Sequence, residues 1–292
     1  MDIVLNWADS YAFDNMYSAM PEILQPYISD RAFLVRQCIS LFLIEMAGVH
    51  LLYFALSSLS YYFFYDRNLL KHPKFLKNQI RREIYLSVTS FPITSIVTVP
   101  WFLFEVRGYS KLYYNVQDYG WPYFALSIFM FIMFTDFGVY WIHRLEHHPS
   151  LYWWLHKPHH TWKISTPFAS FAFHPLDGYF QSLPIHIFVY LFPMNAYAYL
   201  VSFVLIQIWT VSIHDAMYIV KHPWINSAAH HTIHHLEFNY NYGQYFTLWD
   251  RIGGSHRYPT YEYENNMYFD RVWKHRATKT DGGAHISKAK DD

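Results

Sequence analysis

Long apolar stretches separated by short polar segments dominate the hydrophobic pattern of the chain. The first three run from Cys38 to Tyr65, from Tyr85 to Phe104 and from Trp121 to Ile142. Each is at least as long as the roughly 20 residues that an α-helix needs to cross a bilayer, and the first is longer. We therefore predict three membrane-spanning helices and an all-α integral membrane protein.

A fourth apolar stretch, from Leu183 to Ile213, is interrupted at Phe192-Pro193-Met194-Asn195. Proline and asparagine favour a turn, so the stretch predicts a helical hairpin. Each limb is short enough to dip into the bilayer without fully crossing it. In total we expect about four transmembrane helices or helical hairpins.

Charge between the predicted helices sets their orientation. The loop from 67 to 82 carries Arg67, Lys71, Lys74, Lys77, Arg81 and Arg82. Basic loops favour the cytosolic side, so the N-terminus and the loop from 105 to 120 are expected to be lumenal. This gives a lumenal segment at 1–37, a membrane domain at 38–259 and a cytosolic tail at 260–292. Residues 1–37 contain five acidic residues and no basic n-region, which argues against a cleaved signal peptide.

Composition agrees with a membrane protein. Hydrophobic residues make up 53% of the chain, aromatic residues 22% and charged residues only 15%, which is too apolar for an average soluble domain. The formal net charge is zero, so nothing indicates nucleic-acid binding. A single cysteine excludes an internal disulfide.

Histidine is concentrated in one part of the chain. Fourteen of the 19 histidines lie between 143 and 235. Residues three and four apart share a helix face, so each of three clusters is expected to present two or three imidazoles to one point. The eight candidate ligands are His143, His147, His156, His159, His160, His231, His234 and His235.

These ligands indicate the kind of metal site. Imidazole suits zinc, copper, nickel and iron, and neither the lone Cys38 nor any recurring carboxylate joins the pattern. A structural zinc ion is satisfied by four ligands, so eight nitrogens predict a two-metal centre. The alternative, solvated or hydrogen-bonded histidines or a metal-storage tract, fits a single short motif better than three clusters. With the predicted orientation, the membrane helices carry a cytosolic, histidine-rich two-metal cap.

Further candidates lie near the clusters. His174 and His214 are expected either to complete the metal coordination or to hydrogen-bond to the ligands. Asp136 shares a helical stripe with His143. Its carboxylate would either accept an imidazole N–H and fix the tautomer or pair with another span. Asp177 and Asp215, which follow the two single histidines, are the other carboxylates expected to orient ligands.

The order of the three clusters resembles the fatty acid hydroxylase/sterol desaturase superfamily, and within it the chain is most similar to the sterol C5-desaturase family. The similarity covers most of 121 to 259. The stretches that carry it are Leu155–His160, Thr166–Ser170, Phe173–Gly178, Trp209–Asp215 and Asn239–Gly254. In the first third of the chain the similarity is mainly in the pattern of spans.

The resemblance implies a di-iron oxidase of the endoplasmic reticulum membrane. Such an enzyme removes hydrogen from C5 and C6 of a Δ7-sterol while O2 is reduced to water, with electrons from cytochrome b5 and its NADH-dependent reductase. The cluster histidines would hold the two iron ions, and His174 and His214 stand where the family also has histidines. No separate catalytic side chain is expected. Because zinc outranks ferrous iron at most nitrogen sites, it can replace iron in purified protein.

Other functions share part of this pattern. A sterol C4-methyl oxidase or a fatty acid 2-hydroxylase would have the same fold and metals but would oxidise a different carbon. A membrane zinc-binding or transport protein would place its histidines at mid-membrane depth. Here the clusters lie at the cytosolic ends of the predicted helices, which favours the enzyme.

The polar tail ends Lys288-Ala-Lys290-Asp-Asp. Lysines three and five places from the end match a cytosolic dilysine-type signal that returns membrane proteins to the endoplasmic reticulum. The predicted cytosolic exposure of the tail supports this interpretation.

Overall fold

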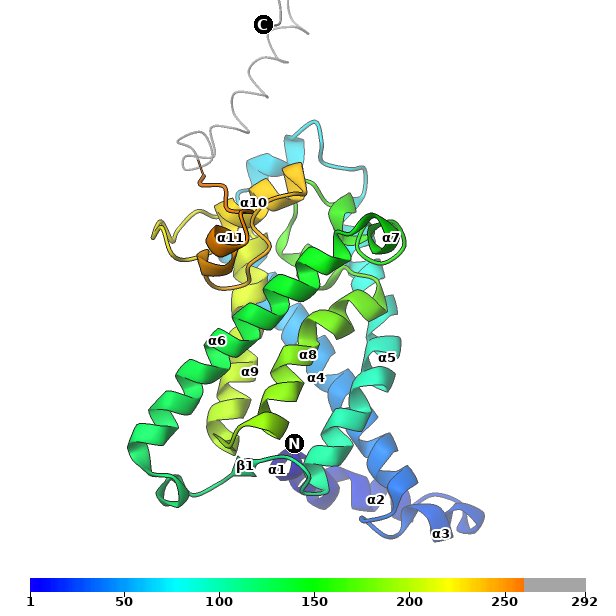
Figure 1. The fold of residues 1–292 in the computed structure, drawn as a ribbon. Coiled ribbons are helices and arrows are strands. Elements are labelled where there is room, and N and C mark those ends of the chain that lie inside the picture. Colours follow the sequence, from blue (N-terminus) through cyan, green and yellow to red (C-terminus); the bar gives the residue numbers. More distant parts are fainter. Residues whose placement is uncertain (260–292) are drawn as a thin grey trace, which may run out of the picture.

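The computed structural model describes residues 1–259, and the predicted tail at 260–292, with the predicted signal at Lys288 and Lys290, lies outside the described residues. Five long helices form a bundle: α4 (Leu34–Phe63), α5 (Gln79–Val106), α6 (Gly120–Glu146), α8 (Pro175–Leu191) and α9 (Ala196–His214). Shorter helices gather at its two ends (Figure 1). At one end lie α1 (Asp2–Ala8), α2 (Asp14–Ser18) and α3 (Gln25–Ile28), and at the other α7 (Pro149–Tyr152), α10 (Ala228–Glu237) and α11 (Leu248–Ile252).

Four helices of the described part are long and apolar enough to cross a membrane: α4, α5, α6 and α9. The predicted all-α membrane fold is therefore confirmed. The helices are longer than the apolar stretches because polar residues continue them beyond the membrane. The helix α5 begins at Gln79, six residues before the predicted start, and α6 continues past Ile142 to Glu146. Because of this last extension, the end of a membrane-spanning helix carries His143.

The predicted helical hairpin is formed by α8 and α9, which are separated by Phe192–Asn195. Asn195 ends the turn, because its side-chain oxygen accepts the backbone N–H groups of Tyr197 and Ala198 and so caps α9. Two short strands, β1 (Leu112–Tyr113) and β2 (Met194–Asn195), pair in parallel and fasten this turn to the α5–α6 connection. Both limbs thus run between the β1–β2 end and the histidine-rich end (Figure 1).

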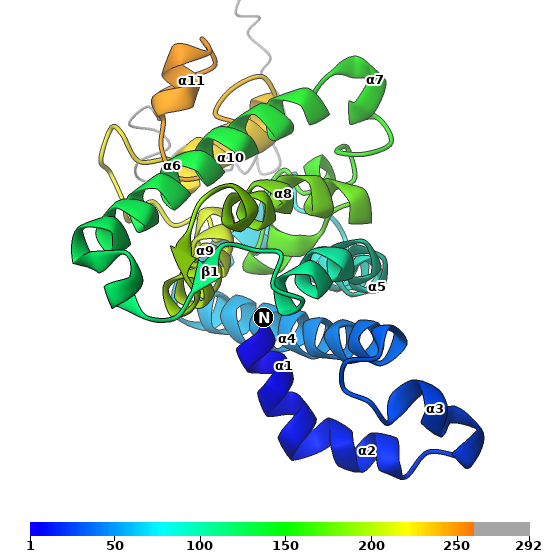
Figure 2. The same cartoon turned by 60° about the horizontal axis from the view of Figure 1, so that its bottom comes forward.

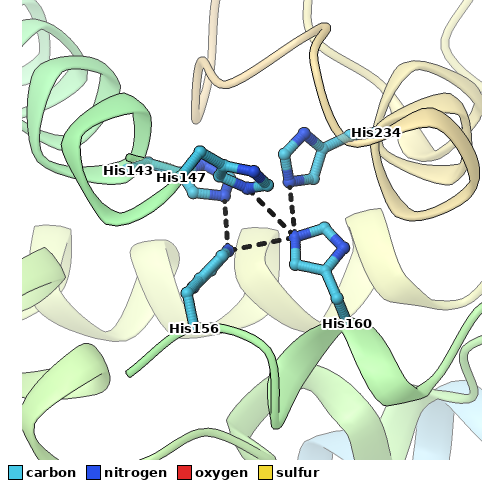
Figure 3. A group of neighbouring side chains, drawn as sticks. All are labelled: His143, His147, His156, His160 and His234. Carbon is cyan, nitrogen blue, oxygen red and sulfur yellow. Dashed lines mark hydrogen bonds between the residues drawn. The ribbon is translucent and has the colours of Figure 1, made fainter. Parts of the chain in front are cut away.

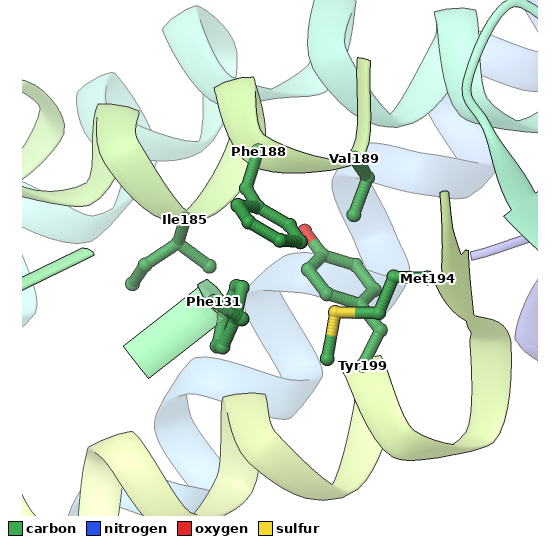
Figure 4. Close-up of a cluster of buried hydrophobic side chains, with 6 residues drawn as sticks. All are labelled: Phe131, Ile185, Phe188, Val189, Met194 and Tyr199. Carbon is green, nitrogen blue, oxygen red and sulfur yellow. The ribbon is translucent and has the colours of Figure 1, made fainter. Parts of the chain in front are cut away.

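Apolar packing joins the hairpin to α6. One buried cluster contains Phe131 of α6, Ile185, Phe188 and Val189 of α8, Met194 of β2 and Tyr199 of α9 (Figure 4). Higher on α6, Gly138 allows α8 to approach closely: a Cβ atom there would lie 2.5 Å from Cγ of Pro184. This packing fixes the position of α6, on which the first histidine cluster is mounted.

The connection between α7 and α8 is folded into the bundle. Its 3₁₀-helix at Pro167–Phe171 is held by α4, where Tyr53 Oη donates to Phe168 O and Ser57 Oγ donates to Pro167 O. These anchors set the path of the segment that follows the second histidine cluster. Figure 2 shows α1, α2 and α3 extending sideways from the bundle. Figure 1 shows that they lie at the end opposite to α10.

Candidate metal centre

Nine buried or half-buried histidines converge at the end of the bundle formed by α6, α9 and α10. They come from the ends of α6 and α9, from the segment after α7 that includes the 3₁₀-helix at His159–Thr161, and from α10. They form two groups, and within each the ligand nitrogens all lie within 4.8 Å of one another. This is the spacing expected when several side chains share one ion.

The first group contains five histidines, shown in Figure 3: His143, His147, His156, His160 and His234. The Nε2 atom of His160 lies 3.1 Å from that of His147, 3.1 Å from that of His156 and 3.0 Å from that of His234. The Nε2 atom of His143 lies 3.1 Å from that of His156. We call these five residues group A.

The second group, group B, contains His159, His214, His231 and His235. The Nε2 atom of His231 lies 2.9 Å from that of His214 and 3.0 Å from that of His235. The Nε2 atom of His159 lies 3.4 Å from that of His214. Group B touches group A, because the rings of His160 and His235 are 4.9 Å apart.

The tautomers of two group A histidines show that their Nε2 atoms are free to bind a metal ion. Nδ1 of His143 lies 2.9 Å from the carbonyl of Tyr242, and Nδ1 of His156 lies 2.7 Å from Oδ2 of Asp177. Carbonyl and carboxylate oxygens only accept, so both Nδ1 atoms carry the proton and both Nε2 atoms carry lone pairs. Two lone pairs 3.1 Å apart repel each other. A cation between them removes this repulsion, so the donor set fits a metal ion.

Similar contacts support other ligands. Nδ1 of His234 donates to the carbonyl of Tyr240 and Nδ1 of His214 to that of Thr210, each at 2.7 Å. Ligating imidazoles usually donate their second N–H in this way, which fixes ring orientation. His214 and His234 therefore also present Nε2 lone pairs toward groups B and A.

The protonation state of these histidines favours metal binding. Burial, helped by neighbouring imidazoles, lowers the pKa of His159, His160, His231, His234 and His235 well below its ordinary value. Burial also lowers the pKa of His147. These rings are therefore neutral at pH 7, the form that coordinates a metal.

The loop between α10 and α11 holds the carbonyls that orient group A. The Asp250 carboxylate accepts the backbone N–H groups of Tyr242 and Gly243, each at 2.8 Å. Asp136 Oδ1 accepts those of Tyr245 at 2.6 Å and Phe246 at 3.3 Å. Asp136 thus fixes the loop relative to α6, and Asp250 fixes it relative to α11.

The structure groups the predicted site histidines differently from the three clusters of the sequence. Nine of the ten candidate histidines lie in groups A and B, but each of the second and third clusters is divided between the groups. The exception is His174, which starts α8 and accepts the N–H of Leu176 at Nδ1. His230 also lies outside both groups, because its ring forms a capping box with Ser227.

The three predicted carboxylates differ in the groups that they contact. Asp177 contacts an imidazole, that of His156. Asp136 instead holds the 245–246 backbone, and Asp215 accepts Met217 N–H and Ser60 Oγ–H, so the expectation that these two contact ligands is corrected. The physical reason is that the nearby imidazole N–H groups are already bound to carbonyls, those of Tyr242 and Thr210.

Sequence reasoning missed Glu146 and the orienting carbonyls. Glu146 is buried three residues after His143, and one of its oxygens lies 3.7 Å from Nδ1 of His156. The helical spacing of three from a ligand was a usable signal. No signal in the sequence marked the carbonyls of Tyr240 and Tyr242, because any residue supplies that group.

A cavity of about 360 Å³ leads from the histidines into the bundle. Its wall includes His143 of group A and His159, His214 and His231 of group B, and it continues between α4, α5, α8 and α9 down to Phe102 and Tyr199. A cavity of this size is typical of a small-molecule site. Apolar side chains dominate its far part, so a long hydrophobic molecule can extend from the metal centre into the membrane domain.

Comparison with known proteins gives one consistent result. The fatty acid hydroxylase family model matches residues 128–255. The chain is 51% identical to a lathosterol oxidase of Rattus norvegicus and 50% identical to one of Homo sapiens, each over 269 residues that cover 89% of this chain and 86% of the relative. It is 49% identical to a Δ7-sterol 5(6)-desaturase of Schizosaccharomyces pombe, over 93% of this chain and 87% of the relative. No solved structure matches.

Proposed function

Because the chain belongs to the fatty acid hydroxylase family and, within it, to the Δ7-sterol 5(6)-desaturases, we propose that it introduces the C5–C6 double bond into a Δ7-sterol such as lathosterol. The observation that carries this proposal is the pair of histidine groups at the end of an apolar cavity inside a membrane bundle. The histidines lie at one end of the bundle, where the cavity closes. An ion transporter would place such residues near the middle of the membrane, so this position favours oxidation of a bound lipid.

The reaction balances with O2 as oxidant. The sterol loses two hydrogen atoms, an electron donor supplies two electrons, two protons enter, and O2 leaves as two water molecules. Neither the C5–H bond nor the allylic C6–H bond of a Δ7-sterol is acidic enough to be broken by side-chain acid–base chemistry, so the reaction needs a redox centre. Two iron ions held by groups A and B would supply that redox chemistry.

The chain's own residues position and protect this chemistry. The imidazoles of groups A and B would hold the ions, and Asp177 holds the ring of His156. His174, outside both groups, is expected to support α8. The apolar walls keep bulk water away from the reacting carbon.

We propose cytochrome b5, with its NADH-dependent reductase, as the source of electrons. A surface pocket of about 690 Å³ is lined by Lys77, Arg81 and Arg82 together with Trp162. Trp162 follows the segment that carries His159 and His160, and the Arg82 guanidinium lies over its ring. A basic surface beside the metal ligands suits an acidic electron-transfer protein.

The proposed location is the endoplasmic reticulum membrane, with the histidines on the cytosolic side. The basic segment from Lys71 to Arg82 supports this orientation, because it lies at the same end of the bundle as groups A and B.

The test is sterol analysis by mass spectrometry in cells that lack their own C5-desaturase, with and without this chain. The expected result is loss of the Δ7-sterol and appearance of its Δ5,7 product. Unchanged sterols, with the protein expressed and loaded with metal, would contradict the proposal. Conversion of a C4-methyl sterol or a fatty acyl chain would identify the other chemistry.

A further inference from the structure

The geometry points to Gln244 as the acceptor for the substrate's 3-hydroxyl group, and we infer that this residue orients the sterol at the metal centre. The inference rests on the proposed sterol substrate. It assigns a binding site for an alcohol donor at the histidine end of the cavity, with the apolar end of the molecule pointing down the bundle.

The chemistry of the substrate restricts where its hydroxyl can lie. In a 3-hydroxysterol, the oxygen, C3, C4 and C5 are consecutive atoms, so the hydroxyl must be close to the metal centre when C5 and C6 react. The hydrocarbon tail leaves from the opposite end of the ring system. The acceptor must therefore be at the histidine end of the cavity.

Most polar residues of the cavity lie too far along their helices from the metal centre to bind the 3-hydroxyl group. At 1.5 Å per residue, Glu45 of α4 lies about 22 Å below Ser60, which contacts Asp215 next to the metal centre. On α9, Gln207 lies about 10 Å below His214. These residues are level with the middle or tail of a bound sterol.

Gln244 lies at the histidine end of the cavity, where the 3-hydroxyl group must bind. Its amide Nε2 donates to Oγ1 of Thr210 at 3.0 Å, and the backbone carbonyl of Thr210 accepts from Nδ1 of His214. Gln244 also lies two residues after Tyr242, whose carbonyl accepts from His143. It thus sits between a ligand of group A and a ligand of group B, and it lines the cavity.

The hydrogen bonds around Gln244 leave one acceptor free. Thr210 Oγ1 donates to Ile206 O at 2.9 Å, so it must accept from Gln244, which identifies the Gln244 amide nitrogen. The other amide atom, Oε1, has no hydrogen-bond partner among residues 1–259. Gln181, an amide that also lines the cavity, instead donates to Asp177 Oδ1 at 2.6 Å and supports His156.

The backbone holds Gln244 in place before a ligand arrives. Its carbonyl accepts from Nε1 of Trp209 at 2.7 Å, and its neighbours Gly243 and Tyr245 donate to Asp250 and Asp136. A fixed acceptor loses little entropy on binding, so it can set the position of a rigid ring system. The sterol O–H donates to Gln244 Oε1.

The test compares binding of lathosterol and of its 3-ketone, which has nearly the same shape but no O–H to donate. Dissociation constants are measured for the purified, metal-loaded protein in nanodiscs. Wild type is expected to bind the ketone about tenfold more weakly. In Gln244→Met the two ligands should bind about equally, while in Gln244→Glu, which keeps an acceptor, the preference for the alcohol should remain.

Gln207→Met is the matched control. It makes the same change nearly one helical turn further from the metal centre than Thr210, the residue that contacts Gln244. It should retain the wild-type preference, and loss of preference in this variant instead would overturn the assignment. So would an unchanged preference in Gln244→Met with wild-type metal content. If Gln244→Met does not fold, a lost preference for the alcohol in Gln244→Glu would overturn the assignment. If wild type binds no Δ7-sterol, the proposed function itself fails, which is a separate result.

Discussion

Nδ1 of His156 donates a 2.7 Å hydrogen bond to Oδ2 of Asp177, and both side chains are fully buried. The bond joins the second histidine cluster to the first turn of α8, 21 positions later in the chain. Since the carboxylate can only accept, it directs the Nε2 lone pair of His156 into group A.

Asp177→Asn should therefore weaken metal binding. The amide can turn its NH2 group toward His156 and favour the wrong tautomer, and changes to such partners typically cost about 10–100-fold in metal affinity. Competition with a chelator of known affinity measures the change. Asp215→Asn is the control: its carboxylate contacts no imidazole, so an equal loss in that variant would show that the effect is not specific to Asp177.

His174 and His214 should behave differently. His214→Ala removes a member of group B, so metal content per chain should fall and activity should be lost. His174→Ala removes only the cap of α8, which costs about 1 kcal/mol of stability and leaves the metal content unchanged. Elemental analysis of the purified variants measures both contents. Lower metal content in His174→Ala would show that His174 is a ligand.

These two histidines also show how far the sequence could predict the site. His231 and His235 met as expected from their helical spacing, and the apolar stretches marked the membrane helices. His174 and His214 looked equivalent because each is isolated and followed within three residues by an aspartate. Proline directly after His174 was the distinguishing signal, since proline favours the first position of a helix and makes the preceding residue its cap.

The division of the clusters between two groups could not be predicted from spacing. The segment around His156 folds as turns and a short 3₁₀-helix instead of a regular α-helix, so His159 leaves the side occupied by His156 and His160. Its path depends on contacts with α4 and α8, which are remote in sequence. The same applies to the Tyr240 and Tyr242 carbonyls.

Metal-free protein should lose stability as the pH falls. The buried histidines have a lower pKa in the folded state than the value of about 6.5 in an unfolded chain. Below about pH 6.5 the unfolded state binds more protons, so the free energy of unfolding falls with decreasing pH. Thermal unfolding in detergent between pH 5 and 8 measures this. Bound metal should reduce the slope near neutral pH, and a flat profile for the metal-free protein would contradict the neutral, buried state of the rings.

Gly138→Ala should destabilise the bundle. The added Cβ would lie 2.5 Å from Pro184, so α6 and α8 must separate, at a cost of about 1–3 kcal/mol. Gly48→Ala is the matched control, since its Cβ meets nothing within 4 Å. A lower melting temperature in Gly138→Ala alone is expected, and equal melting temperatures would show that α6 and α8 are not tightly packed at this point.

Charge reversal at the basic pocket should weaken electron delivery. Arg81→Glu with Arg82→Glu is expected to raise the KM for cytochrome b5 at low salt by about tenfold or more, with little change in sterol affinity. Lys71→Glu, which changes an exposed charge outside the pocket, serves as the control. Steady-state kinetics at two salt concentrations separate the cases, and equal effects of the two changes would argue against docking at this pocket.

His159 and His160 are consecutive residues that belong to different groups, and so are His234 and His235. A shift of either peptide segment therefore moves a ligand in both groups at once. An ion that orders group A also orders part of group B, so the second ion meets a partly prepared set of ligands. The two sites should consequently fill cooperatively, and a chain with a single ion should be rare at intermediate metal supply.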